Sequence, residues 1–346
     1  MYNFPAEWSR HDATWIAWPH HEPDWPGKIG PIPWVYAEIA RVLATHERVE
    51  ILCHDDDVRA SALEHLAAHG VETNVRLHIV PNDRVWLRDS APTFVRDADG
   101  SAVLVNWGFN AWAKYPNFAR DAEVGRAIER ITKLPRVEPT RPDDGARLIL
   151  EGGGIETDGE GTLLVTEEWL LSDVQVRNPG LDRDGYERAF RDSLGIRHTI
   201  WLGEGCVGDD THGHVDDIAR FVAPGIIALA YEEDPADENH LRSTDNMRRL
   251  ELAGAGDGAL KVVKLPYPRP VTMNGERLPA SYANFYIANG VVLVPTFNDP
   301  NDRVALDILA RLFPDREVVG IHAVDLVWGF GTLHCLTQQQ PARASS

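Results

Sequence analysis

Four groups of polar residues interrupt apolar stretches of the sequence and could take part in catalysis. They are centred on Asp89, on Glu151 before three glycines, on His214 with Asp216, and on Cys335. The flanking residues place each group at the end of a predicted strand or in the loop after one. A charge at the end of an apolar strand is costly unless it is paired or faces a site. The recurrence of this arrangement predicts one shared central cleft.

Taken singly, each of the three non-cysteine groups also has a structural interpretation. Asp89 could pair with Arg88 or cap a turn, and Glu151 beside glycines could be a loop carboxylate. His214 alone could be a structural histidine whose hydrogen bonds are satisfied. The catalytic interpretation therefore depends on their occurring together with a nucleophile.

The nucleophile has to be sought among three cysteines, Cys53, Cys206 and Cys335, whose wide spacing fits neither a disulfide framework nor a zinc site. Cys53 lies in an apolar predicted strand and is expected to be a buried apolar residue. Cys206 lies in a loop close to the histidine cluster and is the rival nucleophile to Cys335. The absence of a disulfide pattern, and an N-terminus without the features of a signal peptide, predict a reducing, cytoplasmic setting.

A cysteine, a histidine and several carboxylates in one cleft suit a cationic substrate better than an anionic intermediate. A guanidinium group is planar, permanently charged, and presents its N–H donors in a fixed fork. Two carboxylates can each accept two of these donors and leave the central carbon open to a thiolate. A hard metal ion would also bind carboxylates, but the cysteine would then have no role.

The bulk composition agrees with a protein that binds a small cation. The 346 residues carry a net charge of −19, with 43% hydrophobic and 25% charged residues. This charge argues against nucleic acid and anionic membranes as partners. It could steer a cationic substrate to the site, or serve solubility alone.

Strands and helices alternate along the whole chain, which predicts an α/β fold. Amphipathic stretches recur about every sixty residues, a period that indicates a repeated supersecondary unit. Asp299 followed by Pro300 is a typical helix start. Helices are predicted at residues 57–69, 118–134, 184–194, 236–252 and 301–313. Strands are predicted at residues 49–53, 76–80, 102–107, 147–150, 162–165, 198–202, 218–222, 225–231, 260–265, 285–288, 291–296 and 317–321. No linker divides the chain, so we expect one domain of about five repeats over residues 1–341 and a disordered tail at 342–346.

The sequence resembles the agmatine deiminases, members of the guanidino-group-modifying superfamily, and more distantly the bacterial peptidyl-arginine deiminases. The resemblance covers nearly the whole chain, and its motifs in this order are very specific. The matching stretches are residues 5–8 (PAEW), 14–19 (TWIAWP), 24–28 (DWPGK), 86–89 (WLRD), 109–112 (FNAW), 151–153 (EGG), 210–211 (DT), 213–216 (GHVD), 278–282 (LPASY) and 334–339 (HCLTQQ).

This resemblance implies the pentein fold, a five-bladed β/α propeller of ββαβ-like units with pseudo-fivefold symmetry. It also implies hydrolysis of agmatine to N-carbamoylputrescine and ammonia, a step of putrescine biosynthesis, without metal or organic cofactor. In this scheme Cys335 matches the nucleophile, His214 the general acid and base, and Glu151 a third carboxylate beside the histidine.

The resemblance further implies the residues that bind the substrate. Asp89 and Asp216 match the two carboxylates that hold the guanidinium. Asp210 falls where the family has a further acidic residue, and Trp86 where an aromatic ring lies along the substrate chain. The partner so implied is a small guanidine, and the sequence leaves monomer and homo-oligomer open.

Four departures from the family pattern bear on the substrate. Ala91 and Ala113 stand where glycines are usual, and Phe330 and Thr332 replace a glycine and an asparagine before the His-Cys pair. We expect them to line the substrate pocket, so the exact guanidine stays open between agmatine, peptidyl-arginine and another compound. A metal-dependent ureohydrolase that uses residues 212–216 as ligands, and a non-catalytic pentein, are the remaining alternatives.

Overall fold

The computed structural model describes residues 2–255 and 260–344. Within these residues the chain forms five sheets of three or four strands and one two-stranded ribbon. Each of the five sheets begins with an antiparallel strand pair, and a helix then leads to a third strand that pairs in parallel with the second. A parallel pair needs such a crossover, and a helix is the usual one.

Four of these units follow one another in the chain. The first comprises β4 (Thr93–Arg96), β5 (Ala102–Val105), α4 (Val124–Thr132) and β6 (Arg136–Val137), and the second β7 (Glu156–Thr157), β8 (Thr162–Thr166), α6 (Arg183–Leu194) and β9 (His198–Leu202). The third comprises β10 (Ala219–Ala223), β11 (Ile226–Ala230), α7 (Glu238–Ala253) and β12 (Lys261–Leu265), and the fourth β15 (Tyr286–Ala288), β16 (Val291–Thr296), α8 (Pro300–Leu312) and β17 (Glu317–His322). The ribbon β13 (Thr272–Met273) and β14 (Glu276–Arg277) lies between the last two.

The fifth unit joins the two ends of the chain. Strand β18 (Gln338–Pro341) pairs with β1 (His11–Ala17), and α1 (Ile32–Ala44) leads from β1 to β2 (Arg48–Cys53). This sheet is extended by α2 (Asp56–Ala68) and β3 (Val75–Ile79). The fold is therefore closed by contacts between residues more than 300 positions apart.

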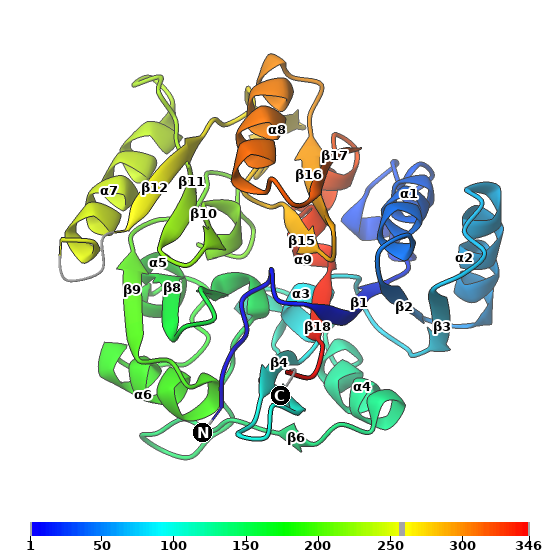
Figure 1. The fold of residues 1–346 in the computed structure, drawn as a ribbon, viewed down its shortest axis with the longest axis horizontal. Coiled ribbons are helices and arrows are strands. Elements are labelled where there is room, and N and C mark those ends of the chain that lie inside the picture. Colours follow the sequence, from blue (N-terminus) through cyan, green and yellow to red (C-terminus); the bar gives the residue numbers. More distant parts are fainter. Residues whose placement is uncertain (1, 256–259, 345–346) are drawn as a thin grey trace.

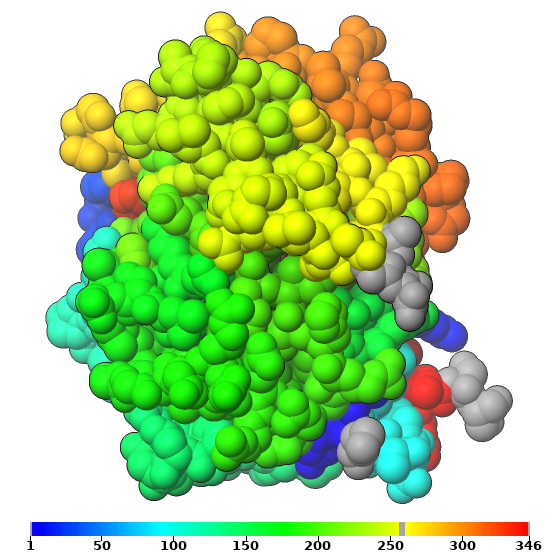
Figure 2. All heavy atoms as spheres, turned by 90° about the vertical axis from the view of Figure 1, so that its left-hand side faces the viewer, coloured from blue at the N-terminus to red at the C-terminus, as the bar shows by residue number. Residues whose placement is uncertain are grey.

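Short helices occupy the middle of the molecule in Figure 1, where α3 (Leu87–Ser90) and α9 (Leu333–Leu336) lie close together. The longer helices lie further from the middle. The remaining short elements are η1 (Glu22–Asp24), η2 (Ala111–Ala113), η3 (Asp121–Glu123), η4 (Gly152–Gly154), α5 (Glu167–Leu171), η5 (Val215–Asp217) and η6 (Leu326–Gly329). Figure 2 shows the side chains around α6 and α7 as the outer surface on one side of the molecule. Among the described residues no helix is long and apolar enough to cross a membrane.

Local sequence explains where the longer helices begin. Asp299 caps α8 by accepting the backbone N–H of Asn301, and Asp302 completes a capping box, as Asp299-Pro300 predicted. Asp182 caps α6 by accepting the backbone N–H of Gly185, and Gly195 ends that helix in the left-handed conformation that glycine adopts without strain. The predicted helices at 57–69, 184–194, 236–252 and 301–313 correspond to α2, α6, α7 and α8.

Several local predictions were wrong. Residues 147–150 form isolated bridges, Gly108 with Ile149 and Thr140 with Arg147, instead of a strand. Asp89 lies in α3 and does not follow a strand. Helix α4 begins at Val124 because the 3-10 turn η3 precedes it. Sequence periodicity also missed α1, β1, β4 and β18.

The C-terminal tail was expected to be disordered from residue 342. Instead, the backbone N–H of Ala342 donates to Arg10 O at 2.7 Å, and that of Ala344 donates to Gly100 O at 3.2 Å. Arg96 also donates to the carbonyl of Ala342. Residues 345–346 lie outside the described part of the chain.

Candidate active site

The structure brings the predicted polar groups together around one glycine. A Cβ atom added to Gly153 would lie 2.6 Å from His214 Nδ1, 2.8 Å from Asp89 Oδ1 and 3.2 Å from Asp216 Oδ2. Asp89 comes from α3, and His214 and Asp216 come from the turn at η5. Gly153 lies in η4, and the three segments are far apart in sequence. The glycines after Glu151 are therefore explained by close packing, since any side chain at 153 would displace the three polar groups.

Cys335 lies on α9 with its thiol among carboxylates. Its Sγ donates to Asp216 Oδ2 at 3.7 Å and accepts the side-chain N–H of Asn284 at 3.1 Å. Burial raises the pKa of the Cys335 thiol well above its ordinary value, and the charges of Asp216 and Asp217 raise it further. The protonated thiol is therefore the resting form, and a nearby cation is needed to favour the thiolate.

The other two cysteines lie elsewhere. Cys206 is buried, and its Sγ donates to the carbonyl of Val207 at 3.5 Å. Burial raises the pKa of Cys206, and burial raises that of Cys53, on β2, to about 12. Neither lines the cavity that Cys335 lines.

His214 is held between two carboxylates. Its Nε2 lies 3.3 Å from Glu151 Oε2, and its Nδ1, which has no hydrogen-bond partner in the structure, lies 3.8 Å from Asp89 Oδ1. Burial by itself would lower the pKa of His214, but the charges of Asp89 and Glu151 and the bond to Glu151 raise it to about 9. The ring is therefore an imidazolium near neutral pH and can give up a proton.

Glu151 is held as a carboxylate. It accepts Trp169 Nε1 at 2.7 Å and Arg177 Nε at 3.1 Å, and it is fully buried. Burial would raise its pKa, but the Arg177 charge and His214 lower it to about 2. A permanent negative charge beside the histidine follows.

The two aspartates expected to hold the guanidinium are both buried. Asp89 accepts the backbone N–H of Gly153 and the indole N–H of Trp112, each at 2.9 Å, and burial raises its pKa to about 6. Asp216 Oδ2 lies 2.7 Å from His334 Nδ1, whereas its Oδ1 has no partner. Burial would raise the pKa of Asp216, but the bond to His334 and its charge lower it overall.

A cavity of about 460 Å³ leads to these groups. Cys335 and Asp89 line it, as do the predicted residues Trp86 and Asp210, while His214, Asp216 and Glu151 are buried and are not among its lining residues. Its lining residues are His21, Pro23, Asp24, Pro26, Arg84, Trp86, Asp89, Trp112, Tyr115, Asn117, Asp210, Thr211, Met273, Gly329, Phe330, Gly331 and Cys335. A volume of this order is typical of a small-molecule site.

Three of the four departures from the family pattern were wrongly expected to line this cavity. Phe330 does so, but Ala91, Ala113 and Thr332 are not among its lining residues. Thr332 is buried, and its hydroxyl donates to Asn284 Oδ1 at 2.8 Å. Ala113 has φ 54° and follows Trp112 at φ 59°, so a left-handed backbone is kept here without glycine.

Sequence reasoning missed Asn284, whose side chain connects several parts of the site. Its Oδ1 accepts Thr332 Oγ1 and the backbone N–H of His334, and its Nδ2 donates to Cys335 Sγ and to Asp217 Oδ1. Asn284 lies two residues beyond the matched stretch 278–282, and its own neighbours carry no signal of this role.

Three further residues next to the site were also missed. Glu7 Oε2 lies 2.8 Å from His334 Nε2 and accepts from Arg88 Nη2 at 3.1 Å, so His334 connects Glu7 to Asp216. Both Glu7 and His334 lay within motifs that the sequence had singled out. Asp217 is buried, and burial together with Asp216 raises its pKa well above the ordinary value.

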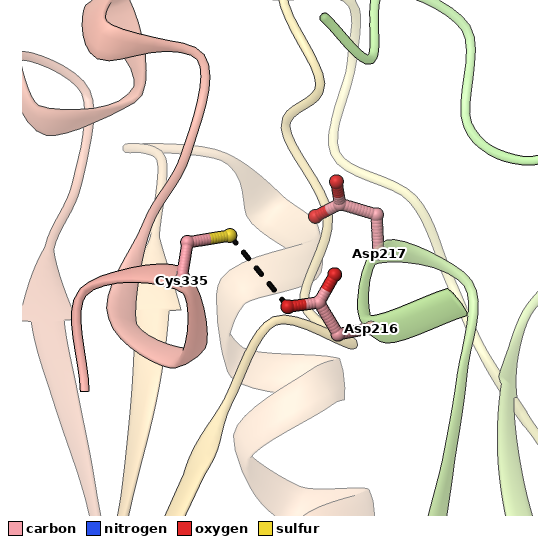
Figure 3. Close-up of side chains that lie close together, drawn as sticks. All are labelled: Asp216, Asp217 and Cys335. Carbon is pink, nitrogen blue, oxygen red and sulfur yellow. Dashed lines mark hydrogen bonds between the residues drawn. The ribbon is translucent and has the colours of Figure 1, made fainter. Parts of the chain in front are cut away.

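One group at the site has the composition of a metal site. Asp216, Asp217 and Cys335 face one another in Figure 3, and their ligand atoms all lie within 4.8 Å of each other. Two of the three, Asp216 and Cys335, are also residues that the sequence predicted to hold the guanidinium and to attack it.

Known proteins resemble the chain over its full length. The family model of Porphyromonas-type peptidyl-arginine deiminase matches residues 3–341. The agmatine deiminase of Pseudomonas aeruginosa strain LESB58 is 38% identical, over 99% of this chain and 96% of that protein.

Solved structures of agmatine deiminases share the fold. The enzyme of Enterococcus faecalis superposes with a TM-score of 0.89 at 30% identity, over 99% of this chain and 96% of that one. A C. jejuni agmatine deiminase with substrate bound gives a TM-score of 0.87 at 26% identity, over 100% and 98%. The fold is thus the mixed α/β pentein fold of these deiminases, and the chain belongs to the Porphyromonas-type peptidyl-arginine deiminase family.

Proposed function

We propose that this protein is an agmatine deiminase, which hydrolyses agmatine to N-carbamoylputrescine and ammonia through a covalent amidino-cysteine. The observation that carries the proposal is the placement of the Cys335 thiol 3.7 Å from Asp216 Oδ2, in a cavity whose wall also holds Asp89. The full-length similarity to agmatine deiminases supports agmatine over other guanidines.

The free acceptors of the site suit a guanidinium. Asp216 Oδ1 is buried without a partner, so a guanidinium N–H would satisfy it. Asp89, with a pKa of about 6, is ionised at neutral pH and supplies the second carboxylate. Two carboxylates fix the plane of the guanidinium and present its carbon to Sγ.

The reaction follows from the protonation states of the thiol and the histidine. The bound cation favours the thiolate, and Sγ bonds to the guanidinium carbon. The thiol proton reaches the departing nitrogen by way of His214, and the C–N bond breaks. The released ammonia takes the remaining imidazolium proton of His214 and departs as ammonium. His214, now neutral, takes a proton from water, whose oxygen bonds to the same carbon. The C–S bond then breaks, leaving a urea and the free enzyme.

The five sheets with one shared topology support a finer description of the fold. We infer that they are the blades of a pentein propeller with pseudo-fivefold symmetry, in a single domain that extends to residue 341. The three free cysteines, Cys53, Cys206 and Cys335, are compatible with our proposal that the protein acts in the cytoplasm on a small cationic guanidine.

A substrate panel tests this function. Ammonia release would be measured with agmatine, free arginine and a peptide that ends in arginine, before and after dialysis against a strong chelator. We expect agmatine to have the highest kcat/KM and the chelator to leave the rate unchanged. A higher kcat/KM for the peptide would identify peptidyl-arginine, and not agmatine, as the substrate. Activity lost to the chelator and restored by manganese would instead indicate a metal ureohydrolase.

A further inference from the structure

Besides Asp89, the cavity wall holds two carboxylates, Asp24 and Asp210. Agmatine carries an ammonium at the end opposite to its guanidinium, so one of these carboxylates is expected to bind it. The two carboxylates differ in how many of their oxygens already accept a hydrogen bond within the protein. This difference indicates which of them binds the ammonium.

Both oxygens of Asp210 are taken within the protein. Lys114 Nζ donates to Oδ1 and forms an ion pair with it, and Tyr115 OH donates to Oδ2 at 2.7 Å. Lys114 also places a like charge where a substrate ammonium would have to bind. A second cation therefore gains little at Asp210 unless Lys114 moves away.

Asp24 has one oxygen free. Its Oδ1 accepts Arg84 Nε at 3.1 Å, whereas Oδ2 is buried and has no hydrogen-bond partner in the structure. The side chain is 9% exposed. A buried carboxylate oxygen without a donor is unfavourable, so a ligand that supplies an N–H donor there is stabilised. Burial also raises the pKa of Asp24 to about 6, although Arg84 lowers it in part, which leaves the group ionised at neutral pH.

Arg84 holds Asp24 in place from the cavity wall. Its guanidinium lies 4.2 Å from the centre of the Tyr115 ring, and its Nη1 has no partner. The pair is joined by a single N–H···O bond rather than by two parallel ones, so each side chain keeps an unused polar atom.

Trp86 connects the two ends of the cavity. A Cβ atom added to Gly331 would lie 2.9 Å from the Trp86 ring and 3.0 Å from Cys335 Cβ, and one added to Gly329 would lie 2.7 Å from the same ring. Trp86 and Trp25, which follows Asp24, have ring centroids 5.7 Å apart. An apolar surface for the methylene chain thus extends from the thiol toward the segment that carries Asp24.

We propose that Asp24 is the residue that selects an ammonium at the distal end of the substrate, accepting it through Oδ2 while Asp89 and Asp216 hold the guanidinium. This assignment rests on the proposed deiminase function and specifies its substrate as a guanidine with a cationic tail. Asp24 also disfavours a carboxylate tail, which would otherwise bind the unused Nη1 of Arg84.

The test compares agmatine with pentylguanidine, in which a methyl group replaces the ammonium. Wild-type protein is expected to prefer agmatine in kcat/KM. Asp24→Asn should lower kcat/KM for agmatine about 10–100-fold, mainly through KM, because the negative charge that strengthens the bond to the ammonium is lost. Its kcat/KM for pentylguanidine should change less than about threefold, because that compound makes no bond to Oδ2.

Asp210→Asn is the matched comparison and should affect agmatine less than Asp24→Asn does. A third compound, 4-guanidinobutyrate, ends in a carboxylate and should become a better substrate of Asp24→Asn than of wild type, because Arg84 is released. This gain cannot come from a damaged fold.

The outcomes distinguish a failure of the proposed function from a failure of the role of Asp24. Wild type that hydrolyses neither agmatine nor pentylguanidine would overturn the proposed function. Wild type active on both, with an unchanged agmatine preference in Asp24→Asn, would overturn the role of Asp24 alone. Equal loss on both substrates in Asp24→Asn and Asp24→Glu alike would make Asp24 a structural residue and would also overturn it.

Discussion

Asn284 Nδ2 donates to Cys335 Sγ over 3.1 Å, from a side chain that is completely buried. The same amide nitrogen donates to Asp217 Oδ1 at 3.0 Å, and the amide oxygen accepts the backbone N–H groups that begin α9. Asn284 thus fixes the helix that carries the thiol and at the same time supplies a donor to the sulfur. A donor to sulfur stabilises the thiolate relative to the thiol.

Replacement of Asn284 by alanine is therefore expected to lower kcat for agmatine about 10–100-fold, because a hydrogen bond to a developing charge is worth about 1.5–3 kcal/mol. Asn246→Ala is the control, since Asn246 is equally buried and bonds Gly203 N and Glu204 O away from the site. Both variants should lose thermal stability, but only Asn284→Ala should lose turnover. Similar kcat losses in the two would show that Asn284 acts through stability alone.

Asp89→Asn and Asp216→Asn are each expected to lose most activity while the fold survives. Each change removes a buried carboxylate from the guanidinium, which costs a few kcal/mol and so on the order of a hundredfold in kcat/KM. Asp158→Asn is the control, because Asp158 is a buried turn carboxylate that accepts the backbone N–H groups of Glu160 and Thr162. Near-normal turnover by either site variant would remove that aspartate from guanidinium binding.

Cys335 should be labelled selectively by a cationic reagent shaped like the substrate. A haloacetamidine brings a positive charge beside the thiol and lowers its pKa, which the neighbouring carboxylates otherwise raise. Intact-protein mass spectrometry should show one label, added faster than by neutral iodoacetamide and blocked by agmatine. Label at Cys206, or ammonia release by Cys335→Ala, would contradict the assignment of the nucleophile.

The pH profile should be bell-shaped. Asp89 must be ionised to bind the guanidinium, so kcat/KM should rise as pH passes its pKa of about 6. His214 must be protonated to assist the departing ammonia, so kcat/KM should fall as pH passes about 9. Pentylguanidine is the substrate for this measurement, because its neutral tail avoids a contribution from Asp24.

Glu151→Gln should move the falling limb of that profile to lower pH, since it removes a carboxylate that raises the pKa of His214. The control is Glu50→Gln, which removes a remote buried carboxylate 2.6 Å from His78 Nε2 and should leave both limbs in place. An unmoved falling limb in Glu151→Gln would mean that His214 does not set it.

The sequence by itself determined the reaction class and indicated the residues proposed to carry it. Cys335, His214, Glu151, Asp89 and Asp216 were chosen from residue types and motif order, and the structure brings all five together. The alternation of strands and helices and the cap at Asp299 could also be predicted from the sequence, because periodicity and capping depend on neighbours within one element.

Tertiary structure alone decided how the two ends of the chain pair and what lies around the thiol. The pairing of β18 with β1 and the bond from Asn284 to Cys335 join positions 51 or more residues apart, and no local pattern encodes such contacts. Tertiary structure also decided the difference between Asp210 and Asp24. Which carboxylate is already occupied depends on Lys114, Tyr115 and Arg84, and that was set by side-chain packing in the cavity wall.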